Sequence, residues 1–399
     1  MTQLWYNSYY NIIICCGVPE EVTMQNPFHF RELPVEAPFC NRQVEIKELL
    51  SHASNAANVV LFSPRRYGKT SLVKKVQQQL SKKKLAAIYM DFFGIDSVDD
   101  MSARLASRVF SFCHGNEPLF KKAIGFLSVW RPVLRPDPEY GISLTVEPTA
   151  RKKGVELLED TLSGLGRFIK DYRRGCHIVF DEFQEIVELR ESLQVEGIMR
   201  SHIQTHANAS YFFVGSRRRI LNDIFNEKKR PFYRSAINYP LPPLPSEEAA
   251  EFILEQFRRS GKVCPQAIAT RIVEAVRGYP YYIQRIPYSV FEISGKRITE
   301  EDYTKGFRKA LEGERPVYEA LLQSLSLQQI KIISALADQV TESPYSAEYM
   351  ARHGLGSVGG LQGALKKLME LDYIEQDRGV FQVVDPVFGI WLRHLKEGS

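Results

Sequence analysis

The chain has few cysteines, no long hydrophobic run and little net charge, and each of these shortages excludes a class of protein. Its six cysteines include no Cys-x-x-Cys pair and no cluster with histidine, which argues against a zinc site and against a disulfide-bonded secreted fold. No apolar run reaches the roughly 18 residues that a membrane span needs. Lysine and arginine number 52 against 47 acidic residues, so the net charge of +5 does not indicate a polycation. We therefore expect a cytoplasmic protein that does not span a membrane.

What the sequence does contain is the composition of an ordinary globular protein. Hydrophobic residues make up 44% and charged residues 25% of the 399 positions. At roughly 150 residues per domain, this length predicts two or three domains. Residues 1–23 show no helical or strand period, whereas Met24 opens a segment that looks like an ordinary protein start. We expect residues 1–23 to be a disordered tail or an over-extended start.

A strand-like apolar run, a loop and a helical pattern follow one another between residues 58 and 80. This order lets the loop amides and the helix N-terminus point at one anion, as a phosphate-binding P-loop requires. Lys69 is expected to reach the β- and γ-phosphates of a nucleotide, and the Thr70 hydroxyl to hold Mg²⁺. The pattern Gly-x-x-x-x-Gly-Lys-[Ser/Thr] has Ser63 in place of its first glycine, so this motif alone is weak. The predicted nucleotide-binding residues of the loop are Ser63, Pro64, Arg65, Arg66, Tyr67, Gly68, Lys69, Thr70 and Ser71.

A second apolar run ends in two adjacent carboxylates, Asp181 and Glu182. At the tip of a strand, Asp181 suits the Walker B role of holding Mg²⁺, and Glu182 is placed to orient or deprotonate the attacking water. In isolation this pair would be interpreted as a solvated acidic turn. Its occurrence together with the Lys69 loop favours a P-loop nucleoside triphosphatase. The chain has no guanine-binding [Asn/Thr]-Lys-x-Asp motif, so ATP is expected rather than GTP.

A third apolar run, residues 211–214, is followed by Gly215, Ser216 and three arginines that start at Arg217. Ser216 is predicted to contact the γ-phosphate or the attacking water, and thus to act in catalysis with Lys69. The arginine run, with Arg217 first, either senses the same phosphate or solvates the start of a helix. The sequence does not choose between these two interpretations.

Together these segments resemble the archaeal-type ATPases of the STAND class, which are relatives of the AAA+ and origin-recognition ATPases. The resemblance implies that Pro280 lies against the nucleotide from a helical lid, and it extends over roughly residues 24–395. It rests on several ordered motifs: Asn26-Pro-Phe, Phe39-Cys-Asn-Arg, residues 64–71, Asp181-Glu-Phe-Gln, Gly215-Ser, Pro231-Phe-Tyr-Arg and Gly278-Tyr-Pro.

The chain divides into three parts after residue 23. Residues 24–245 read as an α/β P-loop ATPase core with a RecA/AAA+-like five-stranded parallel sheet. Helical patterns over 246–314 predict a helical lid domain. The order helix, helix, glycine-rich turn, helix and two short strands over 317–395 predicts a winged-helix domain. The five expected strands are residues 59–62, 86–92, 178–180, 211–214 and 237–241.

The connection between the second and third expected strands is unusually long. Its alternating run at residues 142–146 predicts an inserted hairpin, and a helix is expected from Val155 to Asp171. We expect residues 115–150 to be the surface for an unidentified protein partner.

The winged helix has two interpretations, a regulatory element packed on the core or a module that binds duplex DNA. Residues 357–371 would be its recognition-type helix, with Lys366 and Lys367 facing outward. Two lysines are weak evidence for DNA. The Gly-x-Gly-x-x-Gly match at 354–359 follows a helical segment rather than a strand, which argues against a dinucleotide site.

Two further groups of residues can each be interpreted either as a binding site or as part of the structure. His202 and His206 stand four apart on an expected helix without a third ligand, which favours a solvated face over a metal site. Phe28, Phe30 and Phe39 either wall an adenine pocket or pack in the core.

These observations predict an ATPase, slow in turnover, that binds ATP and Mg²⁺ between core and lid. We expect it to act as a switch whose winged helix reports or restrains the nucleotide state. The alternative is an ATP-gated DNA-binding protein that loads its winged helix onto duplex DNA. A scaffold that binds nucleotide without turnover is a third hypothesis.

Overall fold

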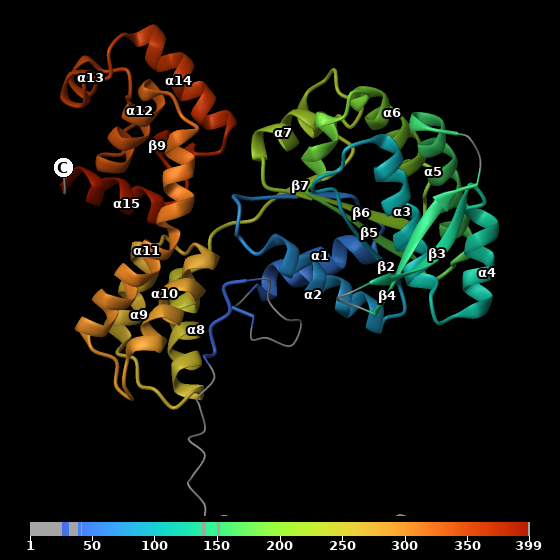
Figure 1. The fold of residues 1–399 in the computed structure, drawn as a ribbon, viewed down its shortest axis with the longest axis horizontal. Coiled ribbons are helices and arrows are strands. Elements are labelled where there is room, and N and C mark those ends of the chain that lie inside the picture. Colours follow the sequence, from blue (N-terminus) through green and yellow to red (C-terminus); the bar gives the residue numbers. More distant parts are fainter. Residues whose placement is uncertain (1–25, 32–38, 41, 138–140, 150–151, 398–399) are drawn as a thin grey trace, which may run out of the picture.

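The computed structural model describes residues 26–31, 39–40, 42–137, 141–149 and 152–397 of the chain, so the prediction for residues 1–23 lies outside the described residues. Figure 1 shows a sheet with its helices on one side of the molecule and a helical part, from α8 to α15, on the other. Within the described ranges, no helix combines the length and the apolar character that crossing a bilayer would demand.

A five-stranded parallel sheet forms the centre of the first part, as predicted. Its strand order is β2-β5-β6-β1-β7, so β1 lies between the strands that precede and follow α7 (Arg218–Asn226). Parallel pairing brings the carboxyl ends of β1, β5 and β6 to one edge, which is where open α/β sheets bind ligands. The strands are β1 (Val59–Phe62), β2 (Ala86–Asp91), β5 (Cys176–Asp181), β6 (Ala209–Gly215) and β7 (Ile237–Pro240).

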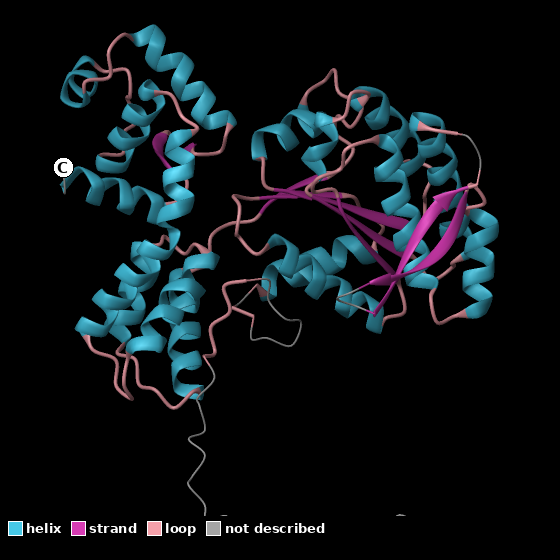
Figure 2. Cartoon of the chain, in the orientation of Figure 1, coloured by secondary structure: helices cyan, strands magenta, loops and turns pink. Residues whose placement is uncertain are grey.

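Helices cover both faces of this sheet (Figure 2). Because successive strand residues point to opposite faces, Val59 and Leu61 of β1 pack with α1 and α2, whereas Val60 packs with the helices of the other face. Both faces are therefore buried over the central strands β1, β5 and β6, which are mostly apolar, whereas the edge strand β7 is largely exposed. The helices are α1 (Gln43–Ser54) and α2 (Lys69–Lys82) on one face, with α3 (Val98–Cys113), α5 (Gly154–Asp171) and α6 (Ser192–Ile203) on the other.

The long connection holds α4 (Glu117–Phe126) and the predicted hairpin, formed by β3 (Trp130–Asp137) and β4 (Gly141–Pro148) in antiparallel register. Trp130 anchors its base, since the ring is buried and Nε1 donates a 2.8 Å hydrogen bond to Thr161 on α5. The hairpin is thus fixed to the core at its base.

The second part of the chain packs as one continuous hydrophobic cluster from α8 to α15. The predicted lid and the predicted winged helix share α11, which runs without interruption through Pro316. The lid helices are α8 (Ser246–Arg259), α9 (Gln266–Ala275), α10 (Pro280–Ile293) and α11 (Glu300–Gln323). The winged helix adds α12 (Leu327–Asp338), α13 (Ala347–His353), α14 (Val358–Glu370), β8 (Ile374–Asp377), β9 (Val380–Val383) and α15 (Pro386–Glu397).

The described residues at the start of the chain lie against the lid. Phe28 is buried, with its ring centroid 4.8 Å from that of Phe257 on α8. Phe30 packs edge-on against Tyr288 of α10 at 4.9 Å. These two aromatic residues therefore pack against the lid. Of the two interpretations of the sequence, packing in a hydrophobic core is the one that applies to them. Phe39 packs, partly buried, with the cluster between α1, α2 and the sheet.

Candidate active site

Lys69 begins α2 directly after the loop of residues 63–68. Gly68 has φ +79°, a left-handed conformation that suits glycine and turns the chain into the helix. The Lys69 side chain is buried, and Nζ donates to the carbonyls of Ser63 (3.1 Å) and Pro64 (2.9 Å). Burial lowers the pKa of Lys69 to about 8, although the nearby carboxylates act in the opposite direction. A buried ammonium group thus lies at the N-terminus of α2, where a phosphate would bind.

Thr70 and Asp181 meet at the ends of α2 and β5. The Thr70 hydroxyl donates a 2.7 Å hydrogen bond to Asp181 Oδ2, and the Tyr89 hydroxyl donates to the same oxygen at 2.6 Å. Hydroxyl and carboxylate oxygens are hard ligands that suit Mg²⁺, so this pair fits the metal that the sequence predicted. Tyr89 was missed, because the pairing of β2 beside β5 cannot be seen in the sequence.

Glu182 follows at φ +49°, a conformation uncommon for residues other than glycine. Its Oε2 atom accepts hydrogen bonds from the Ser216 hydroxyl at 3.2 Å and from the Gln184 side-chain amide. The structure therefore brings Ser216, at the end of β6, to the predicted catalytic carboxylate. Gln184 was part of the motif that carried the family resemblance, but no role was predicted for it.

Arg217 turns toward η1 (Phe183–Glu188), where it pairs with two glutamates. Its guanidinium lies 2.9 Å from Glu188 and 3.9 Å from Glu185. The predicted role of Arg217 in phosphate sensing stays a prediction.

The lid contacts the P-loop through Tyr279. The Tyr279 hydroxyl donates a 2.5 Å hydrogen bond to the Arg65 carbonyl, and its ring centroid lies 4.6 Å from that of Tyr67. Pro280 is the first residue of α10, next to this contact. The lid thus reaches the loop where the resemblance implied it, while contact between Pro280 and nucleotide remains a prediction.

Arg66 makes a second bridge from the loop to the lid. Its guanidinium lies 2.8 Å from Glu314 on α11 and 4.3 Å above the centre of the Tyr281 ring. The Tyr281 hydroxyl donates to the same Glu314 carboxylate. Loop, α10 and α11 are therefore joined by one polar cluster. Ser71, the last predicted loop residue, is half-buried in the first turn of α2.

Arg218 connects the core to the winged helix through two acidic residues. Its backbone N–H donates to Asp372 Oδ2 at 3.0 Å, its Nε lies 3.2 Å from Asp372 Oδ1, and its Nη1 lies 2.6 Å from Glu375. Asp372 follows α14 and Glu375 lies on β8. The winged helix therefore contacts the core at Arg218, two residues after Ser216 in the sequence.

Two family models match the chain. Residues 39–286 match the family described as "ATPase domain predominantly from Archaea", and residues 316–394 match "Probable winged helix domain". The chain belongs to this family of ATPases. The predicted enzyme class, the resemblance and the winged helix are thereby confirmed. No curated protein sequence matches the chain.

Two solved structures share the fold of this ATPase over most of its length. A Walker-type ATPase of Pyrococcus abyssi has 18% sequence identity and a TM-score of 0.65, over 89% of this chain and 96% of that one. The ORC2 protein of Aeropyrum pernix has 15% identity and a TM-score of 0.51, over 93% of this chain and 98% of that one. Identities this low establish the fold alone.

The two histidines of the ATPase do not share one helix, because α6 ends at Ile203, before His206. His206 is buried, with Nδ1 2.6 Å from the Tyr211 hydroxyl, and burial lowers its pKa to about 4. The interpretation as a solvated face is therefore wrong for His206, which packs inside. Among the residues that the structure describes, no group of three or more His, Cys, Asp or Glu side chains is placed to hold a metal ion.

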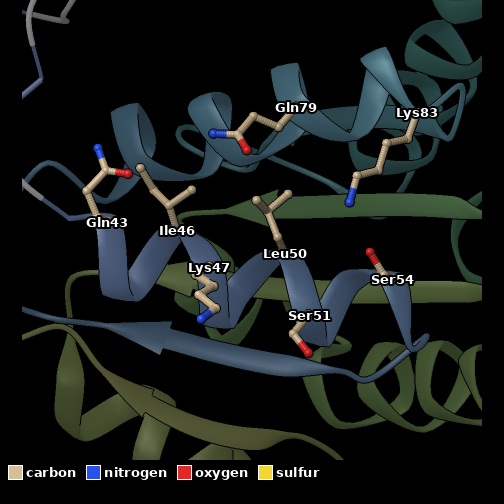
Figure 3. Close-up of a pocket in the computed structure, with 8 residues that line it drawn as sticks. All are labelled: Gln43, Ile46, Lys47, Leu50, Ser51, Ser54, Gln79 and Lys83. Atoms are coloured by element: carbon tan, nitrogen blue, oxygen red, sulfur yellow. The ribbon is translucent and has the colours of Figure 1, made fainter.

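A hollow of about 400 Å³ lies between α1 and α2, away from these residues (Figure 3). Figure 3 shows Ile46 and Leu50 between the two helices, with polar side chains around them. It is lined by Gln43, Ile46, Lys47, Leu50, Ser51, Ser54, Gln79 and Lys83. Since no predicted nucleotide residue lines it, this hollow is separate from the active site.

Proposed function

We propose that this ATPase is a nucleotide-dependent switch of the STAND/AAA+ type, in which ATP at the P-loop controls the docking of the winged helix. The contact between Arg218 and Asp372 carries the proposal. It lies two residues from Ser216, whose hydroxyl is bonded to the catalytic carboxylate of Glu182. A movement of Ser216 caused by a change at the γ-phosphate would therefore reach the docking contact at Arg218 through two peptide bonds.

In the proposed reaction, water attacks the γ-phosphate of ATP. Lys69 leaves its two loop carbonyls to meet the phosphates, and Glu182 orients the water and takes its proton. Thr70 and Asp181 would hold Mg²⁺, which would supply positive charge to the phosphates when bound. Ser216 keeps the Glu182 carboxylate in place. The ORC2 protein of similar fold was solved with ADPNP and ADP, which supports an adenine nucleotide here.

The proposed division of labour follows the predicted domains: core 24–245, lid 246–314 and winged helix 317–395. The lid is positioned to sense nucleotide through two contacts with the loop. Tyr279 donates a hydrogen bond to the Arg65 carbonyl, and Glu314 pairs with the Arg66 guanidinium. The hairpin region 115–150 remains the proposed surface for a protein partner.

The outward face of α14 favours regulation over sequence-specific DNA binding. This helix carries Gly359, Gly360 and Gly363 at exposed positions, and glycine has no side chain to read base edges. Its carboxyl end also leads directly into Asp372, which is bonded to the core. DNA binding would therefore require release of the winged helix and use mainly Lys366 and Lys367.

The test is the distance between core and winged helix, measured by energy transfer between a fluorophore on α6 and one on α13. ATP should change this distance in the wild type and, persistently, in Glu182→Gln, which binds without turnover. Lys69→Ala is the control and should not respond. An unchanged distance in Glu182→Gln with ATP bound would refute the switch. An ATP-dependent gel shift with duplex DNA at low salt would instead favour the DNA-binding alternative.

A further inference from the structure

The side chain of Gln184 lies between the catalytic carboxylate and the end of the sensor strand β6. It is 1% exposed, and its Nε2 donates a hydrogen bond to Glu182 Oε2. Ser216 donates to that same oxygen at 3.2 Å. Two donors thus converge on one oxygen of Glu182, while no described residue hydrogen-bonds its Oε1.

This arrangement is costly for a purely structural glutamine. Gln184 Oε1 is buried and has no hydrogen-bond partner among the described residues, and a buried unsatisfied acceptor costs stability. Glu182 itself stands in the left-handed region, at φ +49°. Two adjacent local costs are typical of a functional site, where the geometry of a reacting group is held at the expense of stability.

Gly215 is shaped to admit this amide. A Cβ at position 215 would lie 1.9 Å from Gln184 Oε1 and 2.9 Å from the Leu221 side chain, so any larger residue there would displace the amide. The glycine of the sensor strand and the glutamine of the Walker B segment therefore form one packing unit.

We infer that Gln184 is a positioning residue for ATP hydrolysis: it fixes Oε2 of Glu182 and thereby turns Oε1 toward the attacking water. The inference rests on the proposed role of Glu182 in placing that water. Gln184 itself does not contact the nucleotide in this scheme, and its loss should slow the chemical step without weakening ATP binding.

The experiment measures kcat, KM and the Kd of a fluorescent ATP analogue for Gln184→Met and Gln184→Glu. Both variants keep the length of the side chain and remove the amide donor, and the glutamate adds repulsion against Glu182. We expect kcat to fall about tenfold in Gln184→Met and further in Gln184→Glu, with Kd within about twofold of the wild type. The matched control is Gln77→Met, which removes another buried amide donor, bonded to the Ile88 carbonyl at 3.1 Å. It should lower thermal stability without lowering kcat.

Gly215→Ala attacks the same contact from the other side and should reproduce the loss of kcat. Adding Gln184→Ser to it removes the clash with Oε1 without restoring the amide donor, so part of the stability should recover while kcat stays low. The inference is overturned if Gln184→Met turns over like the wild type, or if kcat and nucleotide affinity fall together. Glu182→Gln distinguishes failure of this inference from failure of the proposed role of Glu182. If Glu182→Gln is inactive while Gln184→Met is fully active, only the inference fails. If Glu182→Gln hydrolyses ATP at the wild-type rate, the proposed role of Glu182 fails, and the inference with it.

Discussion

The hydroxyl of Thr70 and the carboxylate of Asp181 are joined by a 2.7 Å hydrogen bond, although the two residues are 111 positions apart. One belongs to the first turn of α2 and the other ends β5. Both oxygens are suited to hold Mg²⁺ when it binds with the nucleotide, and the hydroxyl would then turn its proton away from Asp181. The contact therefore marks where Mg²⁺ is expected to enter.

Thr70→Val should remove the Mg²⁺-dependent part of ATP affinity, because the methyl group that replaces the hydroxyl cannot ligate a metal. We expect Kd for ATP to rise at least about tenfold with Mg²⁺ present and to change little with chelator present. Titration of a fluorescent ATP analogue with and without Mg²⁺ measures both. Thr70→Ser keeps the hydroxyl and should bind like the wild type. Equal Mg²⁺ dependence in Thr70→Val and wild type would contradict the assignment.

Glu182→Gln should bind ATP normally and lose turnover. The amide cannot accept the proton of water, and general-base catalysis contributes about 10²–10⁴-fold, so a loss of that order in kcat is expected. Phosphate release and nucleotide Kd, measured on the same sample, check both halves of the prediction. Glu185→Gln, on the neighbouring η1, is a suitable control since Glu185 contacts Arg217 and not Ser216.

The sequence was sufficient for the sheet and for the P-loop because both are local patterns. Apolar runs predicted all five strands. The motifs predicted that Lys69, Thr70 and Asp181 belong to one site, and the structure brings Thr70 and Asp181 into contact. Contacts made between strands or domains were not predictable. Tyr89 reaches Asp181 only because β2 pairs with β5, and that order is decided by packing of the whole sheet.

The boundary between lid and winged helix shows a second limit of sequence analysis. Pro316 lacks an amide hydrogen and would be expected to end a helix. α11 nevertheless continues through it to Gln323, packing against lid residues before it and winged-helix residues after it. Tertiary burial on both sides thus outweighs the local penalty. The docking of Arg218 on Asp372 has the same origin, in residues far apart along the chain.

ATP affinity should fall at alkaline pH because of Lys69. Burial lowers its pKa to about 8 in the free protein, so the amine loses its proton as pH rises through 8. Anionic phosphates favour the charged form, and binding above that pH must therefore take up a proton. We expect Kd to rise by up to about tenfold per pH unit above 8. Lys69→Arg remains charged throughout, so any residual binding should lack this slope. Parallel slopes in both proteins would rule out Lys69 as the cause.

Tyr89→Phe should raise the Mg²⁺ concentration needed for half-maximal hydrolysis. The phenol donates at 2.6 Å to the Asp181 oxygen that also accepts from Thr70, so its loss frees the carboxylate to rotate. A hydrogen bond to a charged group is worth about 1.5–3 kcal/mol, which sets an expected shift of roughly tenfold or more. Tyr172→Phe is the control, because that hydroxyl donates to the Lys84 carbonyl far from the site. A shift of the same size in both variants would show a general loss of stability.

Removing the docking contact should release the winged helix. Arg218 and Asp372 are each less than a quarter exposed and share one backbone and one side-chain hydrogen bond, so each is worth more than a surface ion pair. Arg218→Ala and Asp372→Ala should each enlarge the radius of gyration in X-ray scattering and change the basal rate of ATP hydrolysis several-fold.

The double variant decides whether the two residues act through one contact. If they do, Arg218→Ala with Asp372→Ala should go no further than the stronger single variant, whereas independent effects would add. Arg219→Ala is the matched control, since that arginine approaches Glu370 only to 3.9 Å and is 42% exposed. It should leave the protein as compact as the wild type. Additive effects of the two substitutions, or equal compactness in every variant, would mean that the winged helix is held by the α8 to α15 cluster and not by its contact with the sensor strand.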